Sequence, residues 1–195
     1  MDEFQDTFYS SSLKTLRIFK WFLDFYSTSS SKPPYLVKAD DDVFIHVPNL
    51  VSHLRSLNDS VLPYMGGALH VRATVTRRKS SKFFVPRDLW PDRHYPPYLS
   101  GPCYILSTDL VHQVFLASFK VPLFHLEDVY ITGMVANQTL GVKLAGLPAD
   151  VMVEKASILS RAIQFRTNVW KAIAYHGVVD GGMMKHLYRV ANLRD

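Results

Sequence analysis

The stretch LVKADDDVFIHV, residues 36–47, places three consecutive aspartates between two apolar runs. These runs, residues 35–39 and 43–46, have the composition of strands that enter a buried sheet. Adjacent carboxylates at such a place repel one another and are costly to remove from water without a partner. A solvated acidic loop would avoid that cost. A divalent cation would also remove it, because Mg²⁺ and Mn²⁺ bind one or two carboxylates together with substrate phosphates.

Helical and extended patterns alternate on both sides of this stretch. Serines 10–12 can cap a helix that ends at a serine-rich loop with two prolines, residues 27–34. The other predicted elements are helices at 48–57, 108–119, 127–137 and near the C-terminus, and strands at 63–69, 103–107 and 142–147. This alternation predicts an α/β fold. With 195 residues, 48% of them hydrophobic, the chain is long enough for one domain spanning residues 1–195.

The composition narrows the range of functions only slightly. A net charge of +5 is compatible with a phosphate-bearing ligand, an acidic polymer or a membrane surface. The one cysteine, Cys103, excludes an internal disulfide and a cysteine-based zinc site, and we interpret it as a buried thiol. The apolar stretch IFKWFLDFY is interrupted by Lys20 and Asp24, so we interpret it neither as a signal peptide nor as a membrane span.

Residues 72–98 differ from the rest in being both basic and aromatic. The segment holds five aromatic residues and seven basic ones, Arg72, Arg77, Arg78, Lys79, Lys82, Arg87 and Arg93. We predict a long surface excursion over the core. No nucleic-acid-binding motif accompanies these charges, so we expect no nucleic-acid partner.

Three further segments carry residue types that could do chemistry. FHLEDVYITG, residues 124–133, opens a predicted helix with Glu127 and Asp128, which could favour the helix N-terminus or supply a general base. YPPYLSGPCYILS, residues 95–107, predicts a tight turn at 100–102 followed by a strand, and it could be structural or could line a substrate site. His176 in AIAYHGV is a lone histidine, a type that is more often structural than a ligand.

The order of these motifs is more specific than any one of them. KADDDVF, then YPPYLSG, then LEDVY, then a late HGV resembles the β-1,3-galactosyltransferase family of inverting, nucleotide-sugar-dependent enzymes, which includes β-1,3-N-acetylglucosaminyltransferases. The resemblance begins at DTFYSSSLKTL and covers nearly the whole chain. It implies a GT-A-type, Rossmann-like domain. Compared with members of that family, the chain is expected to lack the N-terminal part, which comprises the membrane anchor, the stem and the first strands of the catalytic domain.

The resemblance also implies roles for individual residues. Asp42 would bind Mn²⁺ directly, His176 would complete the metal site, and Asp40 and Asp41 would orient the metal and the donor. Asp128 would be the catalytic base. Cofactor-binding residues around the donor and acceptor would be Tyr98, Ser100, Gly101 and Glu127. The family commonly shows YPPYCSGGGYV, so Leu99 replaces a cysteine of an implied disulfide, and Pro102 and Cys103 replace glycines of the pocket loop.

The activity implied is transfer of galactose from UDP-galactose to the 3-hydroxyl of an acceptor sugar in β linkage. UDP-N-acetylglucosamine is the alternative donor, and the acceptor would be a glycan on a glycoprotein or glycolipid. The catalytic domain would lie in the lumen of the Golgi, held to its membrane only through the absent anchor. Two other hypotheses remain open, a non-catalytic relative that binds a glycan or partner enzyme and a metal-dependent phosphohydrolase.

Overall fold

The computed structural model describes residue 5 and residues 7–57, 62–153, 171–178 and 180–191. Helices and strands alternate along them, as the sequence predicts. In chain order the elements are η1 (Phe8–Ser10), α1 (Ser11–Tyr26), β1 (Tyr35–Ala39), β2 (Val43–Ile45), α2 (Val47–Ser56), β3 (Met65–His70), β4 (Tyr98–Ser107), α3 (Thr108–Ser118), η3 (Val129–Thr139), β5 (Ala145–Gly146), β6 (Met152–Val153), β7 (Ala174–His176) and α5 (Gly181–Ala191). Within these residues, none of the helices has the length and apolar character needed to cross a membrane.

The strands form two small sheets of mixed direction. One has the order β1-β4-β3-β5 and the other has the order β2-β7-β6. β4 runs antiparallel to both of its neighbours, whereas β3–β5 and β6–β7 are parallel pairs. The α/β class is therefore confirmed, but the mixed sheets do not establish the Rossmann-like type, which stays a prediction.

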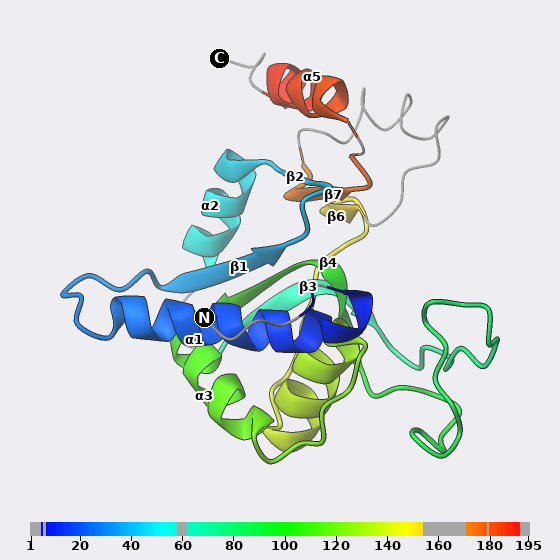
Figure 1. Ribbon diagram of the computed structural model, residues 1–195. Helices are drawn as coiled ribbons and strands as arrows, with labels where there is room; N and C mark the ends of the chain where they lie inside the picture. The colour runs from blue at the N-terminus through cyan, green and yellow to red at the C-terminus, as the bar shows by residue number, and fades with distance from the viewer. Residues whose placement is uncertain (1–4, 6, 58–61, 154–170, 179, 192–195) are drawn as a thin grey trace.

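β4 is buried on both faces and separates two cores. Its residues alternate between them, as a strand requires. Tyr104 and Leu106 pack with α1, α3 and η3, while Cys103 and Ile105 pack with β2, α2 and the second sheet. Figure 1 shows this order of layers, with α1, α3 and η3 on one side of the first sheet and α2 with the second sheet on the other. β1 and β2 belong to different sheets, so the acidic triplet lies where the chain crosses from one sheet to the other.

The predicted turn at 100–102 is wrong in form, because these residues lie inside β4. The strand begins at Tyr98, five residues before the predicted start. Its pairing with β3 changes register between Gly67 and Leu69, which face Tyr104 and Leu99, so residues 100–103 do not follow the regular ladder. Pro102 has no N–H to donate, which a regular ladder would require. The residues that predict a turn thus form an irregular part of a strand instead.

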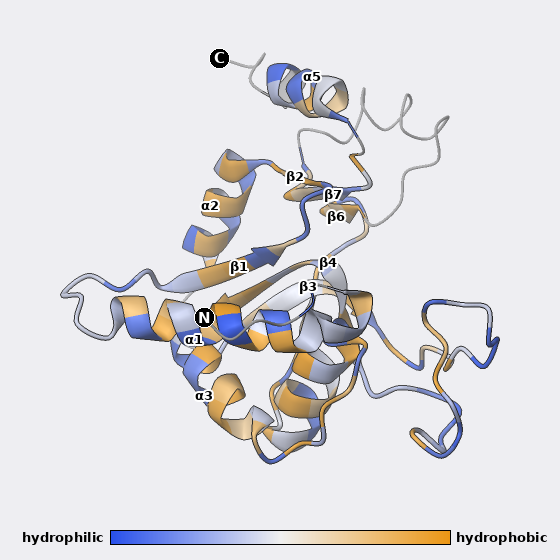
Figure 2. Ribbon diagram, viewed as in Figure 1, coloured by the Kyte–Doolittle hydropathy of each residue, from blue (hydrophilic) through white to orange (hydrophobic). Residues whose placement is uncertain are grey.

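The basic excursion crosses the surface as predicted and has its own internal supports. Arg77 donates hydrogen bonds to the carbonyls of Val85, Trp90 and Asp92 at 2.6–2.8 Å. Val85 is fully buried. Figure 2 shows that hydrophilic and hydrophobic residues are mixed along this segment, which extends to one side of the sheets.

Candidate active site

The acidic triplet is fixed at both ends by the main chain. The Asp40 N–H donates to the Pro102 carbonyl at 2.9 Å. The Asp42 carbonyl accepts from the N–H groups of Gly177 and Val178 at 3.0 and 2.8 Å. The first aspartate is therefore held against β4, and the third is held against the segment that follows β7.

Asp42 and His176 meet because β2 and β7 are paired. The register places Val43 opposite His176, and the His176 Nε2 lies 3.3 Å from the Asp42 Oδ2. Both side chains are partly exposed. Within the part of the chain that the structure describes, no group of three or more histidine, cysteine, aspartate or glutamate side chains could hold a metal ion. The pair itself still fits a divalent cation, since carboxylate oxygen and neutral imidazole are both common metal ligands and phosphates or waters can fill the other positions.

Asp40 faces a different partner. The Lys38 Nζ lies 2.5 Å from the Asp40 Oδ1 and donates to the Gly101 carbonyl at 2.6 Å. It also lies 3.8 Å from the Glu127 Oε2. Burial would lower the pKa of Lys38, but the carboxylates of Glu127 and Asp40 outweigh that effect and raise it above the ordinary value. Lys38 is therefore a permanent cation between the triplet, β4 and the start of η3.

Glu127 is buried beneath this cation. Only 8% of it is exposed, and the Tyr104 hydroxyl donates to its Oε1 at 2.5 Å. Burial raises the pKa of Glu127 to about 7, although Lys38 and Tyr104 favour the ionised form. Direct contact between Glu127 and a nucleotide, which the sequence suggests, stays a prediction.

Asp128, by contrast, is partly exposed and precedes the first residue of η3. Its Oδ1 accepts from the Val129 N–H at 2.8 Å, and its Oδ2 accepts from the Gly101 N–H at 3.2 Å. The Thr132 hydroxyl donates to its carbonyl at 2.6 Å. Burial raises the pKa of Asp128 above its ordinary value, while these N–H groups oppose the shift. An oriented carboxylate that attracts a proton more strongly than usual is suited to general-base catalysis.

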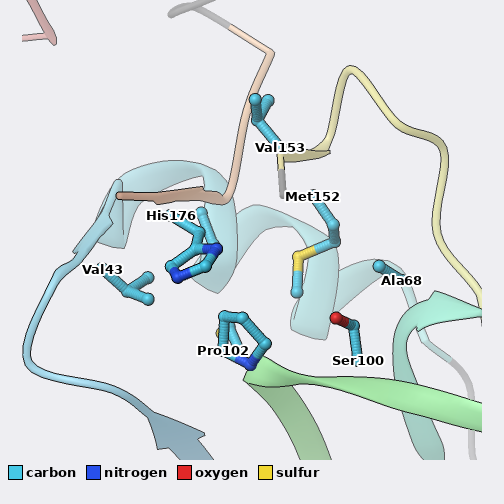
Figure 3. A pocket seen from close by; sticks show the side chains of 9 residues that line it. Val43, Ala68, Ser100, Pro102, Met152, Val153 and His176 are labelled. Atoms are coloured by element: carbon cyan, nitrogen blue, oxygen red, sulfur yellow. The ribbon is translucent and has the colours of Figure 1, made fainter. Parts of the chain in front are cut away.

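Gly101 allows this close approach of β4 to Asp128. A Cβ atom at Gly101 would lie 3.3 Å from the Asp128 Cβ and 3.4 Å from its Oδ2. The residues on either side of Gly101 belong to a different feature, a small pocket. Pro102 and Ser100 line a small pocket with His176, which Figure 3 shows facing Pro102. Its cavity volume is about 10 Å³, room for one water-sized group and not for a sugar.

Cys103 lines the same pocket as a buried thiol. Burial raises its pKa to about 12, so the thiol stays protonated and unreactive at neutral pH. The interpretation of a structural cysteine fits this environment. Leu99, which stands in place of a family cysteine, is fully buried in the other core.

Tyr98 and Asp41 lie at the margins of the site. Tyr98 is half-buried, stacks on His70 with ring centroids 5.1 Å apart and contacts Tyr95 edge to face. Asp41 is exposed in the turn between β1 and β2. The structure thus brings Asp40, Gly101, Glu127 and Asp128 into one cluster. Asp42 pairs with His176, which shares the small pocket with Ser100. Donor contacts of Tyr98 and Asp41 stay predictions.

Sequence reasoning missed Lys38 and Tyr104. Lys38 is the one basic residue of an otherwise apolar strand, which was the available signal. Tyr104 gave none, because an aromatic residue in a buried strand usually serves packing.

Comparison with known proteins identifies the family. The model of the family described as galactosyltransferase matches residues 1–148, which include the triplet, Gly101 and Asp128. The chain belongs to the galactosyltransferase family. The resemblance drawn from the order of its motifs is therefore confirmed. His176 lies beyond the residues matched by the galactosyltransferase model.

Two relatives within this family carry different sugar names. Lactosylceramide 1,3-N-acetyl-β-D-glucosaminyltransferase A of Xenopus laevis is 36% identical over 137 residues, which are 70% of this chain and 35% of that protein. β-1,3-galactosyltransferase 1 of Mus musculus is 37% identical over 134 residues, which are 67% of this chain and 39% of that protein. The chain thus spans less than half the length of these galactosyltransferase-family relatives.

Proposed function

We propose that the chain is the catalytic part of an inverting, Mn²⁺-dependent β-1,3-glycosyltransferase of the GT-A type. The observation that supports this most is the placement of Asp128. Asp128 is partly exposed, and its carboxylate is oriented by two N–H groups and linked through Gly101 and Lys38 to the acidic triplet. A general base beside a cluster that binds a metal diphosphate is what a single displacement at a sugar carbon requires.

The residues of the chain would divide the reaction between them. Asp42 and His176 would hold the Mn²⁺, with Asp40 and Asp41 orienting the donor. When bound, the metal ion would supply a positive charge beside the diphosphate. Asp128 would take the proton of the acceptor 3-hydroxyl. The hydroxyl oxygen would then form a bond to the anomeric carbon from the face opposite the diphosphate, and the bond from that carbon to the diphosphate oxygen would break. UDP leaves with the bonding electrons, and the α-linked donor sugar becomes β-linked.

We propose UDP-galactose as the donor, with UDP-N-acetylglucosamine as the second candidate. The names of relatives support both, because galactosyl- and N-acetylglucosaminyltransferases are similar to this chain to the same degree. The acceptor would be a glycan on a glycoprotein or glycolipid, and the site of action would be the lumen of the Golgi. The relatives support this class of acceptor, since one of them is named for lactosylceramide.

A transfer assay with both donors tests the proposal. The chain is incubated with Mn²⁺ and either UDP-sugar over a panel of acceptors that end in galactose or N-acetylglucosamine, and the product linkage is determined by NMR. We expect one donor to give a β-1,3-linked product that disappears when the metal is chelated. A folded chain that binds UDP and transfers neither sugar would favour the non-catalytic hypothesis. Release of inorganic phosphate from simple phosphate esters would favour the phosphohydrolase.

A further inference from the structure

The partly buried ammonium group of Lys38 contacts Asp40, β4 and the segment that enters η3. Lys38 lies in β1 opposite Tyr104 of β4, and its side chain is 15% exposed. Glu127, at the entry to η3, accepts a hydrogen bond from the Tyr104 hydroxyl. α1 contributes Thr15, which is 3% exposed and whose side chain hydrogen-bonds Glu127. Lys38 is therefore anchored within the protein on one side and faces the acidic triplet on the other.

The contacts of Lys38 connect Asp40 of the acidic triplet with the proposed base, Asp128. It bonds the Asp40 Oδ1 at 2.5 Å and the Gly101 carbonyl at 2.6 Å, and the N–H of the same Gly101 reaches the Asp128 Oδ2 at 3.2 Å. We propose that Lys38 is a positioning residue that holds the acidic triplet and the base in one fixed arrangement. This inference rests on the proposed function. It adds Lys38 to the residues proposed there, which are the acidic triplet, Asp128 and His176.

Neutralising Glu127 is the other role that Lys38 could have, and the geometry ranks it second. Lys38 is 3.8 Å from the Glu127 carboxylate, whereas its two short bonds go to Asp40 and Gly101. Charge-assisted hydrogen bonds of that length fix direction as well as charge. Glu127 already has a 2.5 Å bond from Tyr104.

The test separates these roles with a pair of variants. Lys38→Met alone would leave a carboxylate buried without its cation, which destabilises a protein strongly. Lys38→Met combined with Glu127→Gln removes both charges, and Glu127→Gln alone is the reference, so that any effect of Glu127 cancels. Lys20→Met is the matched control, since Lys20 pairs with Asp24 on the exposed face of α1.

Three quantities are measured for each protein: the melting temperature, the affinity for UDP with Mn²⁺ by calorimetry, and kcat with the better donor. We expect the double variant to melt within a few degrees of Glu127→Gln. Its kcat should be at least about tenfold lower than that of Glu127→Gln, because misplaced reacting groups slow the step. Its UDP affinity should fall severalfold, because Asp40 loses its partner. Lys20→Met should match the wild type in all three.

Two results would overturn the inference while leaving the proposed function intact. One is a double variant with the kcat and UDP affinity of Glu127→Gln, and the other is a double variant that melts far below it, which would make Lys38 a stabilising residue only. Absence of transfer by the wild type would instead refute the proposed function. The UDP affinities would then test the positioning role of Lys38. Equal affinities of the double variant and Glu127→Gln would refute that role. A wild type that neither binds nor transfers overturns both.

Discussion

At the scale of single residues, two neighbouring carboxyl groups have opposite surroundings. Glu127 points inward to Tyr104 and Lys38, whereas Asp128 is partly exposed and bonded by N–H groups. Their adjacency in the sequence therefore does not make them equivalent. Of the two, we propose the partly exposed Asp128 as the catalytic base.

Replacing Asp128 with asparagine should abolish transfer while UDP still binds. Asparagine keeps the shape of the side chain but cannot take a proton, and loss of a general base costs about 10²- to 10⁴-fold in rate. Calorimetry with UDP and Mn²⁺ measures binding, and a transfer assay measures turnover. Asp24→Asn, on the exposed face of α1, is the control. Unchanged turnover in Asp128→Asn would show that another group is the base.

Glu127 should make the stability of the protein depend on pH. Its pKa is about 7 in the folded chain and near 4.5 when unfolded, so folding favours the protonated form. The stabilisation is complete below pH 4.5, declines as pH rises and is lost above about pH 7, a change of about 3 kcal/mol. Denaturant unfolding of the wild type and of Glu127→Gln between pH 4.5 and 8 measures the difference. Parallel profiles of the two proteins would contradict the pKa assignment.

At the scale of elements, the irregular part of β4 lies against the Asp128 side chain. Residues 100–103 leave the regular ladder with β3, and this brings Gly101 against Asp128 at the entry to η3. η3 is a π-helix, a wide winding that is often found at functional sites. The irregular part of β4 and the start of the π-helix η3 thus both contact the Asp128 carboxylate.

Gly101→Ala should impair catalysis much more than stability. The added Cβ atom would lie 3.3 Å from the Asp128 Cβ and 3.4 Å from its Oδ2, so the Asp128 side chain must give way by a few tenths of an ångström. Because a misplacement of about 1 Å can cost a hundredfold in rate, we expect this smaller displacement to lower kcat by roughly three- to tenfold. Gly181→Ala is the matched control, because nothing lies within 4 Å of a Cβ atom there. If both variants turn over at the wild-type rate, the close approach at Gly101 has no catalytic importance.

At the scale of the whole molecule, the candidate site lies at the passage between the two sheets. Asp42 and His176 come from the pairing of β2 with β7, and Asp40 faces β4 of the first sheet. A ligand that binds both groups would hold the two sheets together. Its binding should therefore be visible as a change in global stability.

UDP should raise the melting temperature only when Mn²⁺ is present. A ligand at one hundred times its Kd adds about 2.7 kcal/mol of stability. For a chain of this size, that corresponds to a rise of about 5–10 °C. A metal chelator should reverse the rise, and Asp42→Ala should prevent it, while Asp24→Ala should leave it intact. A shift of equal size in the chelated protein would show that the nucleotide binds without the metal.

The elements and the family could be predicted from the sequence. α1, β1, β2, α2 and α3 lie close to their predicted bounds, because their apolar periodicity and flanking serines and prolines are local signals. The order of the acidic triplet, YPPYLSG and LEDVY was enough to name the family. β4 was predicted too short, because the Gly-Pro signal of a turn occurs here inside a strand whose pairing partners are distant in sequence.

What tertiary structure decided was which of these groups meet. The alternating pattern of β4 does not reveal that it separates two cores, and the spacing of Lys38, Gly101 and Asp128 does not reveal that they lie in one chain of hydrogen bonds. Sequence determines residue types and local conformation through short-range sterics and periodicity. Contacts between segments far apart along the chain bury Glu127 and Asp128, and this burial raises their pKa values. Tertiary contacts also give Asp40 and Asp42 different neighbours, Lys38 for the first and His176 for the second.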